Sequence, residues 1–252
     1  MTQLRDLLYG YGEGQAVTPS EFMVYNTNTQ TSANGGQCCL WTVPTGVSYA
    51  VFEMWSGGGS GAGGCCCMQG GGAGSGGYAI KGCTVAPGQQ IRICASTSGC
   101  CSNSGQTDGI CGCCTFICSL GGGGQPTWNS YVDGGRCVTV QNRCFYYANC
   151  YSCCSQCYCC GGGSGNVDFC IWGTTGSGHA SQYCYDHGFQ MAANAPMTGA
   201  GNKPGPNGCC GWGGSNAFGN FPGGGGNSAQ AYGGGCCCGG PGGGGLVYVV
   251  YY

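Results

Sequence analysis

The chain has 252 residues, of which 59 are glycine and 28 are cysteine, whereas charged residues make up only 6%. Its formal net charge is −2 and its six basic residues are scattered singly, which argues against nucleic-acid binding and a polybasic membrane-binding segment. No apolar run approaches the roughly 18 residues of a membrane span, so we expect no membrane insertion.

The N-terminal segment contains one amphipathic pattern. Leu4, Leu7 and Leu8 have the i, i+3, i+4 spacing of a short helical turn. This turn either caps the fold or docks the chain into a larger assembly. Because residues 1–37 contain no cysteine and no glycine block, we interpret them as an anchoring arm, and residues 38–252 as a glycine- and cysteine-rich β domain.

Strand patterns follow the arm. A Pro-Thr-Gly turn separates two apolar runs at 40–43 and 48–55, and Ala-Pro-Gly-Gln separates two more at 78–85 and 90–95. We expect the second two runs to form an antiparallel pair, closed by the C-terminal run at 246–252. The fold class predicted is mainly β and irregular, with an antiparallel, β-sandwich-like part.

Glycine blocks lie between these strands, at 57–77, 121–124, 161–165, 205–226 and 233–245. Segments without side chains can lie side by side as extended, polyproline II-like helices and satisfy their backbone N–H and C=O groups between segments. We therefore predict packed polyglycine segments that replace part of the usual side-chain core.

Cysteines cluster inside and beside the glycine blocks. Adjacent cysteines seldom bond each other, because a disulfide needs Cα atoms about 5.5 Å apart. Each cluster is therefore expected to tie its segment to another, making the fold disulfide-laced. The structural disulfide candidates are Cys65, Cys66, Cys67, Cys153, Cys154, Cys157, Cys159, Cys160, Cys236, Cys237 and Cys238.

So many cysteines indicate an oxidising compartment, yet the N-terminal MTQLRDLLYGYGEG lacks the apolar run of a signal peptide. A virus particle reconciles the two observations, because it is assembled in a reducing cytosol and acts outside the cell after lysis. The expected location is therefore the virion.

Signs of catalysis are weak. The eight carboxylates are spread singly, without a pair suited to general acid–base chemistry, so we expect no enzyme and no cofactor. A zinc or iron–sulfur site is the alternative use of the cysteines: His179, Cys184 and His187 lie close in sequence, and Cys-x-x-Cys spacings occur at Cys150/Cys153 and Cys154/Cys157.

Aromatic residues alternate with cysteines between Trp128 and Tyr185. Tyrosine and tryptophan give large, rigid contact areas, and a loop pinned by cysteines would present them preorganised. They either cover the glycine segments or contact a glycan or protein on a host surface. The receptor-binding candidates are Trp128, Tyr131, Phe145, Tyr146, Tyr147, Tyr151, Tyr158, Trp172, Tyr183 and Tyr185.

Residues 43–93 carry a resemblance. VPTGVSYAVFEMWSGGGSGAGG followed by GGAGSGGYAIKGCTVAPGQQIRI resembles the glycine-rich domain of tail-fibre and adhesin proteins of tailed bacteriophages. The resemblance implies a particle-borne structural protein of the tail fibre or adsorption apparatus, acting in host attachment, with other virion proteins as partners and a homo-oligomeric state. Two alternatives remain open: a capsid decoration or head-fibre protein, and a non-viral extracellular glycine-helix protein such as an ice binder.

Overall fold

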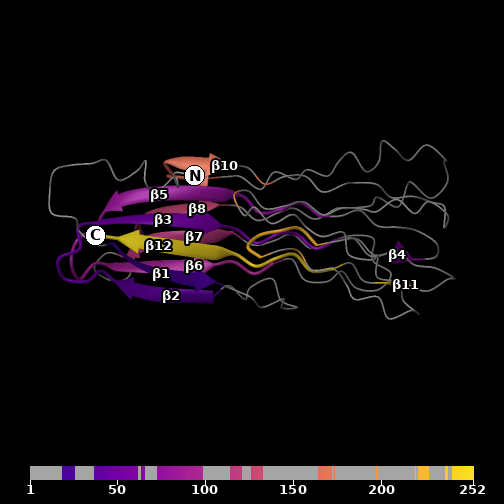
Figure 1. The fold of residues 1–252 in the computed structure, drawn as a ribbon, viewed down its shortest axis with the longest axis horizontal. Helices are drawn as coiled ribbons and strands as arrows, with labels where there is room; N and C mark the ends of the chain where they lie inside the picture. Colours follow the sequence, from indigo (N-terminus) through magenta and orange to yellow (C-terminus); the bar gives the residue numbers. More distant parts are fainter. Residues whose placement is uncertain are drawn as a thin grey trace.

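The computed structural model describes part of the chain, shown in colour in Figure 1. The described residues are 19–25, 37–61, 64–65, 73–98, 114–120, 126–132, 164–171, 173, 197, 219, 221–226, 236–237 and 240–252. Leu4, Leu7 and Leu8 therefore lie outside the described residues.

Strands dominate, and the described ranges contain no helix. The prediction of a mainly β fold is confirmed, with two five-stranded antiparallel sheets. Sheet A has the order β1-β12-β3-β5-β10, sheet B has the order β2-β6-β7-β8-β9, and β11 pairs separately with β4. The strands are β1 Ser20–Tyr25, β2 Gln37–Thr42, β3 Tyr49–Trp55, β4 Gly64–Cys65, β5 Tyr78–Thr84, β6 Gln90–Ala95, β7 Thr115–Leu120, β8 Pro126–Val132, β9 Ser164–Gly165, β10 Phe169–Ile171, β11 Cys236–Cys237 and β12 Leu246–Tyr251.

The expected pairing of the 78–85 and 90–95 runs is wrong. β5 pairs with β3 in sheet A, whereas β6 pairs with β2 and β7 in sheet B. The Ala-Pro-Gly-Gln turn, in which Gly88 has a φ of +80°, leads the chain from one sheet to the other. The two strands thus contribute to the core from different sheets instead of lying side by side. The C-terminal strand β12 likewise pairs with β1 and β3, and with neither of its expected partners, β5 and β6.

A single hydrophobic cluster collects side chains from both sheets. Sheet A supplies Phe52 and Val249, sheet B supplies Ile93 and Ile117, and all four are completely buried. Trp41 on β2 joins the cluster from the edge, with its ring centroid 6.1 Å from that of Phe52. Apolar side chains on the inner faces therefore hold the strands of both sheets together. Burial of their apolar surface stabilises the folded state by about 25 cal/mol per Å².

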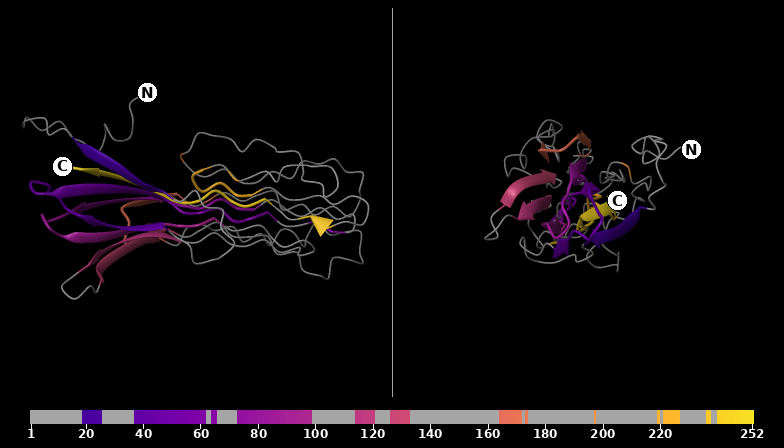
Figure 2. Two further views of the ribbon diagram at one scale, coloured as in Figure 1. Left: turned by 90° about the horizontal axis from the view of Figure 1, so that it is seen from below. Right: turned by 90° about the vertical axis from the view of Figure 1, so that its left-hand side faces the viewer.

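The two ends of the sheets differ. Short turns join β2 to β3 and β5 to β6 at one end, where the C-terminal Tyr252 also lies (Figure 1). At the other end, three connections leave the sheets and return to them: from β3 to β5, from β6 to β7 and from β10 to β12. The coloured glycine-rich stretches run from this end along the long axis of the molecule, with β4 and β11 farther along it (Figures 1 and 2). We call it the glycine end.

Candidate functional site

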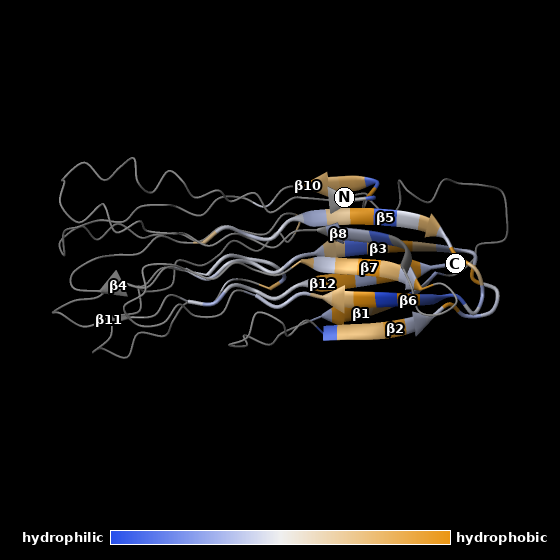
Figure 3. Ribbon diagram, turned by 180° about the vertical axis from the view of Figure 1, so that it is seen from behind, coloured by the Kyte–Doolittle hydropathy of each residue, from blue (hydrophilic) through white to orange (hydrophobic). Residues whose placement is uncertain are grey.

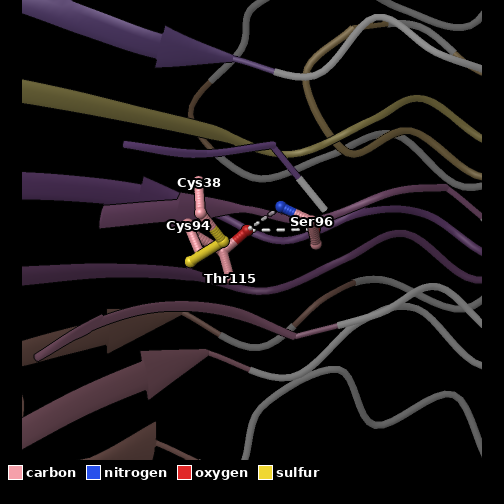
Figure 4. Close-up of a disulfide and its surroundings, with 4 residues drawn as sticks. All are labelled: Cys38, Cys94, Ser96 and Thr115. Atoms are coloured by element: carbon pink, nitrogen blue, oxygen red, sulfur yellow. Dashed lines mark hydrogen bonds between the residues drawn. A yellow bond between two sulfur atoms is a disulfide. The ribbon is translucent and has the colours of Figure 1, made fainter. Parts of the chain in front are cut away.

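Buried hydroxyl groups join the two sheets at the glycine end. The Thr115 hydroxyl donates to the Trp55 carbonyl at 2.7 Å, and the Ser96 N–H donates to the Thr115 hydroxyl at 3.1 Å. The Thr115 and Ser96 hydroxyls are hydrogen-bonded at 2.9 Å (Figure 4). Gly57 N–H donates to the Ser96 hydroxyl at 2.6 Å, and Gly245 N–H donates to the Ser96 carbonyl at 2.8 Å. Ser96 and Thr115 thus connect sheet B to the two glycine-rich stretches that continue sheet A.

Four described stretches form the start of the glycine-rich part: 56–61, 73–77, 221–226 and 240–245. We call them the glycine segments, and they bond to one another through their backbones. Eight backbone hydrogen bonds of 2.7–3.1 Å link them. The N–H donor and carbonyl acceptor of each bond are Gly58 and Gly243, Gly59 and Gly74, Gly61 and Gly240, Ala73 and Gly226, Gly76 and Gly223, Gly223 and Gly244, Gly226 and Gly59, and Gly243 and Gly224. These eight N–H groups and their acceptor carbonyls are therefore satisfied by neighbouring segments and not by side chains.

The close spacing between the glycine segments leaves no room for a side chain at several of their glycines. A Cβ at Gly58 would overlap the carbonyl of Gly224, and one at Gly242 would overlap the carbonyl of Gly58. Cβ atoms at Gly225 and Gly226 would also meet backbone, which cannot move aside as a flexible side chain can. Glycine is required here because another backbone occupies the space of a side chain.

The outer face of sheet A carries a second apolar cluster. Trp55 and Tyr78 pack with ring centroids 4.8 Å apart, and the Tyr78 hydroxyl donates to the Glu53 carboxylate at 3.1 Å. Burial, followed by the charge of Glu53 and this hydrogen bond, raises the pKa of Tyr78 well above its usual range. The Tyr248 hydroxyl donates to Glu21 on β1 in the same way. A carboxylate on the neighbouring strand thus accepts a hydrogen bond from each of the two tyrosines.

Two of the predicted receptor-binding aromatics fall on described residues, and both belong to β8. Tyr131, 37% exposed, lies opposite Phe116, and Trp128 lies opposite Ser119 in the register of β8 with β7. The remaining candidates lie outside the described residues: Phe145, Tyr146, Tyr147, Tyr151, Tyr158, Trp172, Tyr183 and Tyr185. β8 ends at the glycine end and β9 begins there, because Val132 pairs with Ser164. The chain between them, which contains Phe145–Tyr158, therefore leaves and re-enters the sheet at the glycine end.

Among the predicted disulfide candidates, Cys65, Cys236 and Cys237 lie in the small β4–β11 pair, where Cys65 is opposite Cys236. The others are outside the described part of the chain: Cys66, Cys67, Cys153, Cys154, Cys157, Cys159, Cys160 and Cys238. So are His179, Cys184 and His187. Within the described ranges, no group of three or more His, Cys, Asp or Glu side chains is arranged to hold a metal ion.

The one disulfide among the described residues was not a candidate. Cys38 on β2 and Cys94 on β6 are directly opposite each other, with Cα atoms 4.0 Å apart (Figure 4). The described free thiols include those of Cys39, Cys83, Cys118 and Cys170. Burial raises the pKa of Cys83 to about 11 and also raises the pKa of Cys39 and Cys118, which makes these three thiols poor nucleophiles at neutral pH.

Sequence reasoning also missed two exposed aromatic residues. Tyr25 on β1 and Phe221 pack edge to face with ring centroids 6.2 Å apart, and each remains about half exposed. Tyr25 lies within the predicted anchoring arm, but its strand pairs with β12 throughout Ser20–Tyr25. The apolar run FMVY at 22–25 was the signal available for this strand.

No protein-family model matches this chain, and no curated protein matches it. In the described stretches we find no helix of the length and apolar character needed to cross a membrane.

Proposed function

We propose that this chain is a structural protein of a bacteriophage virion, belonging to the tail fibre or adsorption apparatus and acting in host attachment. In this proposal the two sheets form a sandwich-like base, and the glycine segments begin a packed, polyproline II-like shaft. The shaft separates an anchoring end from a binding end. Its partners are other virion proteins and a glycan or protein on the host surface.

The observation that carries the proposal is the number of neighbours around a glycine segment. Residues 56–61 bond to 73–77, to 221–226 and to 240–245. A β-strand bonds to neighbours on two sides only, whereas a three-residue-per-turn helix presents backbone groups in three directions. The bonding pattern therefore favours a bundle of extended helices over a third sheet. Such a bundle suits a rigid spacer made of small residues.

The path of the chain supports a separation of anchoring from binding. β1 starts at Ser20, opposite Tyr251, at the end of sheet A farther from the glycine segments. The arm that precedes β1 therefore enters the sheet at this end, while the aromatic, cysteine-rich connection from β8 to β9 starts and finishes at the glycine end. An arm that docks into a particle would leave the glycine end directed outward.

Two altered particles test this proposal. Deleting Met1–Gly14 should remove the protein from purified particles, because the anchoring leucines are lost. Tyr146→Ala with Tyr147→Ala should leave incorporation unchanged and reduce adsorption to host cells. The matched control is Tyr49→Ala, because Tyr49 is 43% exposed but lies at the opposite end of sheet A from the glycine segments.

Each outcome has a distinct meaning. Loss of adsorption with Tyr146→Ala/Tyr147→Ala but not with Tyr49→Ala supports attachment through the glycine end. Normal adsorption of the double variant contradicts attachment and favours the capsid decoration or head-fibre alternative. Incorporation of the deleted chain into particles contradicts the anchoring role of the N-terminal segment.

A further inference from the structure

Strand β2 is held less firmly than its neighbours. It is an edge strand of sheet B that pairs, among the described residues, with β6 alone, and none of its six residues is fully buried. Its inward-facing residues, Cys39 and Trp41, are only partly buried. Segments with few buried apolar contacts belong to the least stable part of a fold and open locally before the rest unfolds.

Two different attachments hold the two ends of β2. Beyond its C-terminal end, Val43 is 1% exposed and exchanges two backbone hydrogen bonds of 2.9 Å with Gln89 and Gly88. At its N-terminal end, next to the glycine end of the sheets, the Cys38–Cys94 disulfide joins the strand to β6. The disulfide is thus a covalent attachment at the Gln37 end, in addition to the backbone pairing of β2 with β6, whereas Val43 is held by burial and hydrogen bonds alone.

The side chain that β2 contributes to the core is Trp41. Its ring centroid lies 5.5 Å from that of Phe22, 6.1 Å from that of Phe52 and 5.3 Å from that of Tyr251, all three on sheet A. Trp41 thus fills the space between the edge strands of the two sheets. If β2 opened from its Gln37 end, Trp41 would leave its contacts with Phe22, Phe52 and Tyr251, and this edge of the core would lose its tryptophan.

We propose that the Cys38–Cys94 disulfide is a redox latch for β2. With both cysteines reduced, residues 37–41 open from β6 about a hinge at Val43, and Trp41 leaves the aromatic cluster. Oxidation closes the strand against the sheet. The latch is reachable because Cys38 is exposed, although Cys94 is only 2% exposed.

The oxidant is a low-molecular-weight disulfide such as glutathione disulfide. The Cys38 thiolate attacks it, forms a mixed disulfide and releases one glutathione thiol. The Cys94 thiolate then attacks the Cys38 sulfur and releases the second glutathione. The cysteine pair gives up two electrons and two protons, and two glutathione thiols carry them. Excess dithiol reagent reverses the exchange.

Cys39 is a built-in reporter of opening. It follows Cys38, faces the core opposite Ile93 and is a free, half-buried thiol whose pKa burial raises. Opening of residues 37–41 would expose Cys39 to solvent. Cys83 on β5 and Cys118 on β7 lie on strands that the proposal leaves closed, so their thiols are internal references.

The experiment uses the purified full-length chain, pulsed with N-ethylmaleimide at neutral pH, with the labelled cysteines identified by peptide mass spectrometry. In Cys38→Ser/Cys94→Ser, Cys39 should be labelled at least about tenfold faster than in the oxidised wild type, while Cys83 and Cys118 change by less than about twofold. Reduced wild type should behave like the double variant, and glutathione disulfide should restore slow labelling of Cys39. The control Cys170→Ser, which removes a thiol outside the disulfide, should leave the Cys39 rate unchanged.

Two results would overturn the latch. An unchanged Cys39 rate in the double variant would mean that β2 stays closed without the disulfide. Equal acceleration of Cys39, Cys83 and Cys118 would mean that the disulfide braces the whole fold and not one strand.

The biological consequence alone rests on the proposed function: the latch would be open during assembly in a reducing cytosol and closed after lysis. Because labelling of the purified chain requires no particle, the latch and the virion role can fail independently.

Discussion

The sheet part and the glycine segments are packed by opposite rules. In the sheets, large side chains such as Phe52 and Ile93 fill the space between strands. In the glycine segments, backbone fills that space, and even one Cβ at Gly58 has nowhere to go. Figure 3 shows the difference as strongly hydrophobic stretches on the strands and pale, weakly polar segments beyond them. The same chain therefore uses apolar burial in one region and interlocking backbone hydrogen bonds in the other.

This difference explains how the described glycine segments can be ordered. Glycine loses more backbone entropy on folding than any other residue, and it has no side chain to bury. The sheets bring the ends of the glycine segments together, so a large part of that entropy is lost when the strands pair. The buried hydroxyls of Ser96 and Thr115 then connect the sheets to the glycine segments at the glycine end.

The largest expected effect is that of Gly58→Val. The valine side chain would overlap the Gly224 carbonyl. The stretch 56–61, which contains Gly58, is bonded through its backbone to the other three glycine segments. We expect a loss of more than about 4 kcal/mol of stability, or no folded protein, measured by chemical unfolding followed by circular dichroism.

The control for this substitution is Gly46→Ala. Gly46 has nothing within reach of an added Cβ, although its φ is +89°, so only the left-handed conformation is strained, at about 1–2 kcal/mol. A stable Gly58→Val protein would contradict close packing of the glycine segments.

Phe52→Ala tests the opposite rule in the sheets. Phe52 is completely buried and contacts Trp41 across the core, so deleting its ring leaves a cavity. We expect a loss of about 3–5 kcal/mol in the free energy of unfolding. Tyr49→Ala on the same strand, at an exposed position, should change that free energy by less than about 0.5 kcal/mol. Equal losses for the two variants would mean that the sheets are not held by this core.

Thr115→Val tests the junction between the two regions. Valine keeps the shape of threonine but removes the hydroxyl that bonds to Trp55 and Ser96, and it leaves these buried groups without that partner. The expected loss is about 1–3 kcal/mol. Amide exchange at Gly57 and Gly245, which bond to Ser96, should accelerate more than exchange at Val249. Thr115→Ser restores the hydroxyl and should recover most of the stability, whereas failure to recover it would assign the effect to the lost methyl group.

The smallest effect concerns pH. Burial raises the pKa of Cys83 to about 11 from an ordinary value of 9.0, so the folded thiol holds its proton more tightly than the unfolded one. This stabilisation is complete below pH 9.0 and is lost as the pH rises toward about 11. The stability of Cys83→Ala should therefore decline less steeply over this range than that of the wild type, with urea unfolding as the measurement. If the stabilities of the two proteins declined in parallel, Cys83 would not contribute to the pH dependence of stability.

Several strands could be predicted from the sequence because their signals are local. The runs predicted at 48–55, 78–85, 90–95 and 246–252 combine apolar residues with nearby proline and glycine turns, and each contains a strand whose bounds differ by at most one residue at an end. Strands β7 and β8 were missed, since TFICSL and PTWNSYV mix polar and apolar residues and lie beside glycine blocks. Alternation is hard to recognise where polar side chains such as Thr115 and Ser130 are themselves buried.

Strand partners could not be read in the same way. The four-residue Ala-Pro-Gly-Gln turn between the runs at 78–85 and 90–95 suits a hairpin, yet β5 and β6 lie in different sheets because their apolar side chains meet across the core. With 28 cysteines, spacing alone also does not reveal that Cys38 bonds to Cys94. That choice follows from the register of β2 with β6, which places the two residues opposite each other.

By itself, the sequence determined where extended chain forms and that glycine must be packed without side chains, because strand propensity and the absence of a Cβ are properties of single residues and their neighbours. Only the tertiary structure decided which strands pair, which cysteines meet and which glycines touch. Those contacts join residues such as Gly58 and Gly243 that are far apart along the chain, and they form only when the whole set of strands brings the segments together at one end of the sheets.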